Sequence, residues 1–98
     1  MRFSLSLPAL RTPGSTHPFH ESYELARLAE SVGFDTATVG HHHFMPGNAS
    51  DPITWMTAVA AQTERLRVGS GIFQLAIHNP VRVAEQVDTL DQISNGRV

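Results

Sequence analysis

The sequence of 98 residues contains no cysteine, a single tryptophan and no long hydrophobic run, and its formal charge is only −2. Without cysteine the chain has no disulfide, no thiolate metal site and no thiol nucleophile, so its chemistry falls to His, Asp, Glu, Ser or a bound cofactor. No apolar segment approaches the ~18 residues that span a bilayer, and the N-terminus turns polar too soon for a signal peptide. We therefore expect one cytoplasmic domain with neither a membrane nor a nucleic-acid partner.

Hydrophobic periodicity alternates between the period of a strand and that of an amphipathic helix. The sequence predicts three strand–helix units, at about residues 2–32, 34–63 and 66–95, and the start of a fourth strand at residue 97. Asp51 and Asn79, each followed by proline, are typical of helix N-caps. Such alternation predicts an α/β fold with a parallel sheet. Because helices on one side leave the inner face of the sheet bare, the chain resembles a fragment of a larger fold.

Histidine is the most informative residue type in this sequence. In parallel α/β folds the working residues lie on loops at the carboxyl ends of strands, here 8–18, 40–51 and 72–79. All six histidines fall in these loops or within a turn of their ends: His17, His20, His41, His42, His43 and His78. The run 41–43 directly follows the second strand and is the best candidate for proton transfer or ligand binding. His17 and His20 are typical of solvated loop residues, and His78 of a residue that packs beside a helix cap.

Two mechanisms are compatible with the histidine run. His41 and His43 could chelate one divalent ion, as in a metal-dependent hydrolase barrel, because alternate residues of an extended segment point the same way. That hypothesis needs further ligands, which the sequence does not supply at a recognisable spacing. Alternatively, one histidine supplies a proton inside an organic cofactor pocket. The segment 69–71 lacks the lysine of a phosphate loop and indicates close backbone approach to a flat ligand. A third, non-enzymatic hypothesis is an inactive piece that packs against a partner.

Three segments in this order and spacing resemble the bacterial-luciferase-like flavin-dependent monooxygenases. They are Gly33-Phe34-Asp35 through His42-His43-Phe44, then 50–71, and then 78–97, so that the resemblance covers nearly the whole chain. It implies a (β/α)8 TIM-type barrel, of which these residues form the N-terminal three βα units. A closed barrel of this kind typically needs ~250 residues, so the resemblance implies that the chain is part of a larger domain.

The resemblance also implies a chemistry. In this family a flavin lies at the carboxyl end of the strands, and the reduced flavin reacts with dioxygen to oxygenate an aldehyde, a ketone or another small organic substrate. The implied cofactor is reduced FMN, with no metal. A variant within the same family uses a deazaflavin for hydride transfer. The implied partners are the substrate, dioxygen, a flavin reductase and a second copy of the full-length chain in a dimer.

The resemblance assigns roles to particular residues at the end of the second strand. There the family commonly has Glu-His-His-Phe, whose first histidine is catalytic. Residue by residue, this histidine is His42, the second is His43, and the aromatic residue is Phe44. We expect His42 and His43 to be the catalytic residues. His41 stands in place of the family's glutamate and, together with Phe44, is expected to line the substrate pocket.

The third strand carries the implied cofactor contacts. In the family this strand ends in a cis peptide whose backbone bulges against the flavin ring. That feature falls at Gly71-Ile72 here, and we expect Gly71, Ile72 and Phe73 to contact the cofactor. Glycine suits a position where the backbone approaches a ligand closely. Apolar side chains at this edge would keep water from the flavin.

Overall fold

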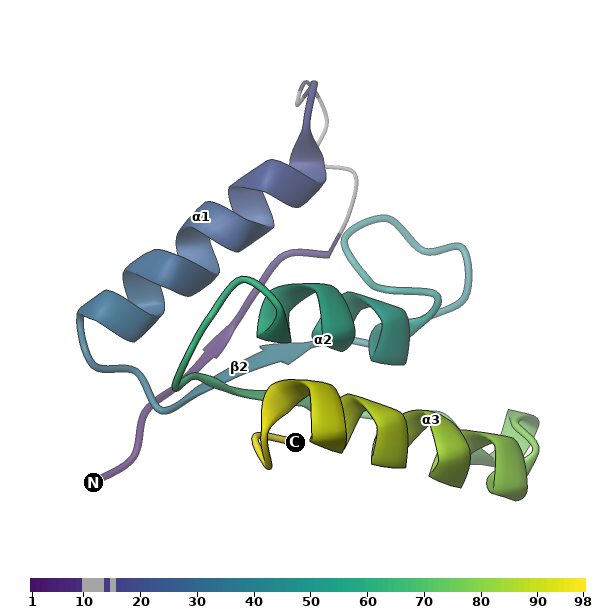
Figure 1. Ribbon diagram of the computed structural model, residues 1–98. Coiled ribbons are helices and arrows are strands. Elements are labelled where there is room, and N and C mark those ends of the chain that lie inside the picture. The colour runs from purple at the N-terminus through teal and green to yellow at the C-terminus, as the bar shows by residue number, and fades with distance from the viewer. Residues whose placement is uncertain (10–13, 15) are drawn as a thin grey trace.

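A computed structural model describes residues 1–9, 14 and 16–98 and has the predicted order of strands and helices (Figure 1). The elements are β1 (Ser4–Ser6), α1 (Pro18–Ser31), β2 (Thr36–Val39), α2 (Pro52–Ala60), β3 (Arg67–Ser70), a short 3₁₀ helix η1 (Leu75–Ile77) and α3 (Pro80–Ser94). The strands form a parallel sheet in the order β1-β2-β3. The predicted α/β fold of three βα units is therefore confirmed. Part of the predicted loop 8–18, namely residues 10–13 and 15, lies outside the described residues.

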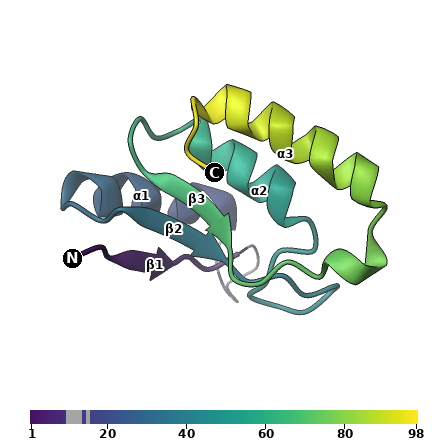
Figure 2. The ribbon, with the colours of Figure 1, turned by 90° about the horizontal axis from the view of Figure 1, so that it is seen from below.

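The two faces of the sheet differ in composition. Leu5, Ala37 and Val68 are in register across the three strands, and the last two are buried. The positions just before and after these residues along each strand point to the opposite face, carry small or polar side chains and are more exposed. Figure 2 shows α2 lying between β3 and α3. Ala37 and Val68 share one buried core cluster with Trp55 and Val59 of α2, so the apolar residues of the sheet face α2. No helix of the described residues lies on the other face, as the sequence predicted for the inner side of a partial barrel.

Local sequence explains where the helices begin. Asp51 Oδ1 accepts a hydrogen bond from Thr54 N–H at 3.2 Å, and Asn79 Oδ1 accepts one from Val81 N–H at 3.0 Å. Both are the predicted N-caps, and each is followed by a proline that has no N–H to leave unpaired. The core lies between the sheet and α2, around the fully buried Trp55. Among the described residues, none of the helices has the length and apolar character needed to cross a membrane.

Glu30 holds the backbone of the connection between α2 and β3 through hydrogen bonds. Its carboxylate accepts backbone N–H bonds from Glu64, Arg65 and Leu66, at 3.0, 2.5 and 2.7 Å. Burial of the carboxyl group raises its pKa, but the three N–H groups and the charge of Arg65 outweigh that effect. The pKa of Glu30 therefore lies below its ordinary value, and ionised Glu30 stabilises the fold.

This arrangement predicts a pH-dependent stability. Because the pKa of Glu30 is lower in the folded than in the unfolded chain, its contribution is present above the unfolded value of about 4.5 and disappears as the pH falls through the folded value. Glu30→Gln should lower the free energy of unfolding by about 1–2 kcal/mol at pH 7. Urea titrations from pH 3 to 7 measure the difference, which should shrink toward the acid end.

Glu85→Gln is the matched control, because Glu85 is 63% exposed and pairs with Arg82 at 3.5 Å on the surface of α3. It should change the stability by less than about 0.5 kcal/mol at either pH. If Glu30→Gln lost the same free energy of unfolding at every pH, the charge of Glu30 would not contribute to the stability of the fold.

Candidate functional site

The segment that follows β2 is held in a compact loop. His41 forms an isolated parallel bridge with Ala49, whose N–H donates to the Gly40 carbonyl at 2.9 Å. The Ala49 carbonyl in turn accepts a bond from His42 N–H at 3.2 Å. These contacts fix the backbone of His41 and His42 at the carboxyl edge of the sheet, where the sequence predicted a site.

His41 is buried beneath this edge. Only 1% of its surface is exposed, and its Nδ1 accepts a hydrogen bond from the backbone N–H of Gln74 at 3.0 Å. Burial lowers the pKa of His41, and the neighbouring charges of His43, His78 and His42 lower it further, while Asp51 opposes them. The imidazole of His41 is therefore neutral near pH 7, with its proton on Nε2.

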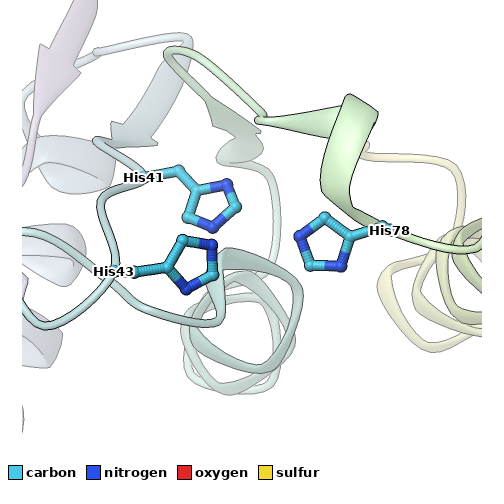
Figure 3. A group of neighbouring side chains, drawn as sticks. All are labelled: His41, His43 and His78. Atoms are coloured by element: carbon cyan, nitrogen blue, oxygen red, sulfur yellow. The ribbon is translucent and has the colours of Figure 1, made fainter.

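A histidine from another loop joins His41 and His43. The ring of His78, from the segment between η1 and α3, lies with its centroid 5.6 Å from that of His41 and 6.2 Å from that of His43 (Figure 3). The His41 and His43 centroids are 4.9 Å apart. Phe73 packs against this group, with its ring centroid 5.2 Å from His41 and 5.0 Å from His78. The sequence predicts a packing role for His78 beside a helix cap, whereas the structure brings its ring to the other two histidines.

The remaining predicted site residues are exposed. His42 is exposed while His41 is buried, so the two side chains differ in their surroundings. Phe44 is 95% exposed and Ile72 is 68% exposed. The peptide bond between Gly71 and Ile72 is cis, at the position that the resemblance implied. Thus the structure brings His41, His43 and Phe73 together with His78 and leaves His42, Phe44 and Ile72 open to solvent. The predicted substrate-pocket role of His41 and Phe44 stays a prediction.

Phe44 has an unfavourable backbone conformation. Its φ of 55° lies in the left-handed region, which disfavours residues with a Cβ, and its exposed ring gains little from packing. Phe44→Gly should therefore leave the free energy of unfolding unchanged or raise it by up to about 1 kcal/mol. Chemical denaturation measures the change. Phe44→Ala, which keeps the Cβ, should be less stable than the glycine variant. A loss above about 1 kcal/mol in Phe44→Gly would contradict this account.

Comparison with known proteins identifies the family. The family model described as "Luciferase-like monooxygenase" matches residues 1–98. This chain belongs to the luciferase-like monooxygenase family. The resemblance noted in the sequence is thereby confirmed, and so is the interpretation of the fold as three βα units of a larger α/β domain. The family includes proteins that use FMN and proteins that use F420.

Individual members of the luciferase-like monooxygenase family are similar over most of this chain. A "Luciferase-like monooxygenase" of Escherichia coli K12 is 40% identical over 81 residues, which are 82% of this chain and 24% of the relative. An "F420-dependent glucose-6-phosphate dehydrogenase" of Mycolicibacterium fortuitum is 39% identical over 84 residues, 80% of this chain and 25% of the relative.

A solved structure of the family shows the same arrangement of elements. The oxygenating constituent of 3,6-diketocamphane monooxygenase from Pseudomonas putida, a type II Baeyer–Villiger monooxygenase in complex with FMN, superimposes with a TM-score of 0.85 at 26% identity. The superposition covers 99% of this chain and 28% of that one. The chain therefore spans about a quarter of the length of the relatives that it matches.

Proposed function

We propose that this chain contributes the first three βα units to a reduced-FMN-dependent monooxygenase, whose substrates are dioxygen and a small organic molecule. The observation that carries the proposal is the face of the sheet on which no described helix lies. The strands of this face lead to the exposed His42 and to the Gly71-Ile72 peptide. Family membership and the FMN complex of the Pseudomonas putida relative support this choice of cofactor. A separate flavin reductase and a dimer of the whole protein stay predictions.

The residues at the carboxyl end of this face fit a flat ring system. Ser6, Thr38 and Gly69 are in register across the three strands and form a strip of small side chains. A Cβ built on Gly69 would lie 3.7 Å from Thr38 Cγ2, and one built on Gly71 would lie 4.0 Å from Thr38 Cβ. Both distances are ordinary contacts, and none of the residues of the strip has a large side chain. Ile72, which follows the end of β3, adds an exposed apolar side chain.

Within this proposal each residue has a defined task. Bound reduced flavin would supply the electrons that activate dioxygen. His42 holds or donates a proton at its imidazole, the side chain used most often in general acid–base catalysis. Ile72 and Phe44 supply apolar surface that excludes water from the same edge. Gly69 and Gly71 keep the strip flat enough for close approach of a ring.

The second candidate function is hydride transfer with the deazaflavin F420, which the 39% identity to the Mycolicibacterium fortuitum dehydrogenase favours. The two functions predict different cofactor affinities. Under anaerobic conditions, equilibrium dialysis of the whole protein against reduced FMN and against reduced F420 compares them directly. The proposal predicts tighter binding of FMN, whereas a clear preference for F420 would replace it with the alternative.

A pair of variants at one position tests whether the flat strip binds the cofactor. Gly69→Ala adds only a Cβ at ordinary contact distance, whereas Gly69→Leu places a bulky side chain over the strip. We expect Gly69→Leu to weaken FMN binding by at least about tenfold, or 1.4 kcal/mol, and Gly69→Ala to have a much smaller effect. Equal affinities in both variants would argue against this face as the cofactor site.

A further inference from the structure

Three imidazoles converge beside the proposed flavin site. One ring nitrogen each from His41, His43 and His78 lies within 4.8 Å of the other two. Figure 3 shows nitrogens of all three rings turned toward the space between them. The centre of such a triangle is at most about 2.8 Å from each nitrogen, and zinc–imidazole bonds are about 2.0–2.1 Å long. Inward movements of less than about 1 Å per ring would bring all three nitrogens to bonding distance.

Two of these nitrogens lack a hydrogen-bond partner. Nε2 of His41 and Nε2 of His78 are buried, and neither has a partner among the residues that the structure describes. The side chain of His41 is almost fully buried, so its unpaired nitrogen is costly unless another group satisfies it. Both atoms belong to the cluster, which makes a shared ligand the simplest explanation for two unpaired nitrogens in one place.

We propose that His41, His43 and His78 bind one divalent transition-metal ion of the zinc type. Imidazole is a preferred ligand of such ions, and three histidines with an open fourth position are a known zinc arrangement. The exposed ring of His43 gives the ion a path from solvent. The aromatic ring of Phe73 forms an apolar wall behind the cluster.

The bond between Gln74 and His41 sets the chemistry of binding. Because the Gln74 N–H donates to Nδ1, the proton of neutral His41 resides on Nε2, the atom that faces the cluster. To bind a metal through Nε2, His41 must move this proton to Nδ1, and the Gln74 N–H then loses its acceptor. The site is therefore weaker than one whose histidines donate from Nδ1 to carbonyls. The Gln74 amide should report the binding event.

An ion at this position would tie two loops together. His41 and His43 belong to the connection from β2 to α2, whereas His78 lies just before α3. The same two connections carry His42 and Ile72, the residues that we place beside the cofactor. The ion would fix their relative positions without taking part in the oxygenation, so the metal site and the flavin site can succeed or fail separately.

The test is zinc binding to the purified protein, prepared without a polyhistidine tag and treated with a chelator. Isothermal titration calorimetry should give one Zn²⁺ per chain, and zinc should raise the melting temperature. His43→Ala and His78→Ala should each weaken binding by at least about tenfold, as expected when a metal site loses a ligand. Circular dichroism confirms that each variant is folded, which is expected for the exposed His43.

His20→Ala is the matched control, because His20 is exposed on α1 and lies 4.0 Å from Glu24, away from the cluster. It should bind zinc as the parent protein does. The proposal would be overturned if the parent protein showed no saturable zinc binding, or if the affinity for zinc were unchanged in both His43→Ala and His78→Ala.

A second measurement uses ¹⁵N NMR spectra of the histidines and of the Gln74 amide. Zinc should transfer the His41 proton from Nε2 to Nδ1 and shift the Gln74 signal, whereas an unchanged His41 tautomer at saturation would overturn the assignment of His41 as a ligand.

Discussion

Replacing His42 with alanine should lower the turnover of the whole protein by about 10²–10⁴-fold, the usual contribution of a positioned acid or base. The side chain of His42 is exposed in this chain, so its removal should change the free energy of unfolding by less than about 0.5 kcal/mol. Steady-state rates with reduced FMN, measured beside a denaturation curve, separate the two effects. A large loss of rate with intact stability is the expected result.

Two further variants define what His42 does. His42→Gln keeps a hydrogen-bonding side chain but cannot exchange a proton near neutral pH, so it should be nearly as slow as His42→Ala if proton transfer is the role. Recovery of most of the rate in His42→Gln would instead indicate hydrogen bonding to substrate or cofactor. His20→Ala removes an exposed histidine from α1 and should leave the rate unchanged. Unchanged turnover in His42→Ala would rule out a catalytic role.

Arg97→Ala should destabilise the fold by about 2–4 kcal/mol, because one guanidinium satisfies several partly buried backbone groups. Its Nη1 and Nη2 donate to the carbonyls of Leu66 and Ala60 at 2.9 and 2.8 Å, and its Nε donates to Ser94 O at 2.6 Å. Nη1 also bonds Thr63 Oγ1 at 3.1 Å. Arg97 thus joins the ends of α2 and α3 to the start of β3. Urea denaturation measures the loss.

Arg97→Lys distinguishes geometry from charge. Lysine keeps the positive charge but lacks the planar fork that reaches several acceptors at once, so it should recover less than half of the lost stability. Arg82→Ala is the matched control, since Arg82 is 72% exposed and pairs only with Glu85 among the ion pairs found in the described residues. It should cost less than about 0.5 kcal/mol. An Arg97→Ala variant as stable as this control would contradict the role of Arg97.

The fold follows from the sequence where local signals are strong. Asp51 and Asn79 mark helix starts because their side chains satisfy free N–H groups, a local effect that a sequence reveals. The ends of elements are less predictable. The second unit was predicted to run to residue 63, whereas α2 ends at Ala60, and the turn that follows is held by Glu30 from α1. Such a distant partner leaves no local pattern.

The fourth strand shows the same limit. Its start was predicted at Arg97, which has no strand assignment in the structure, although the Arg97 carbonyl accepts a bond from Val68 N–H at 2.8 Å. This bond lies at the edge of β3 that faces away from β2. Periodicity indicates where a strand is expected, but the hydrogen-bond ladder that defines it depends on distant segments and leaves no local pattern.

The site was only partly predictable for a related reason. The run of histidines after β2 is visible in the sequence itself, and the cis peptide at Gly71-Ile72 was implied by the family resemblance. The position of His78 beside His41 and His43 could not be predicted in this way. The turn of η1 brings His78 to them, and η1 has no periodic pattern in the sequence. Nor does any sequence pattern indicate that a backbone N–H of Gln74 would fix the His41 ring. The one available indication of the cluster was that the adjacent strands β2 and β3 are both followed by loops that contain histidines.

The fate of molecular oxygen is the most direct test of the central claim, that a reduced flavin at the helix-free face of this sheet drives oxygenation. The whole protein would be incubated with reduced FMN, ¹⁸O₂ and a panel of small aldehydes and ketones, and the products analysed by mass spectrometry. The account predicts a product that carries one ¹⁸O atom from dioxygen and forms only when reduced FMN is present. Oxidation of the substrate without label, dependent on F420 as the hydride acceptor, would contradict it.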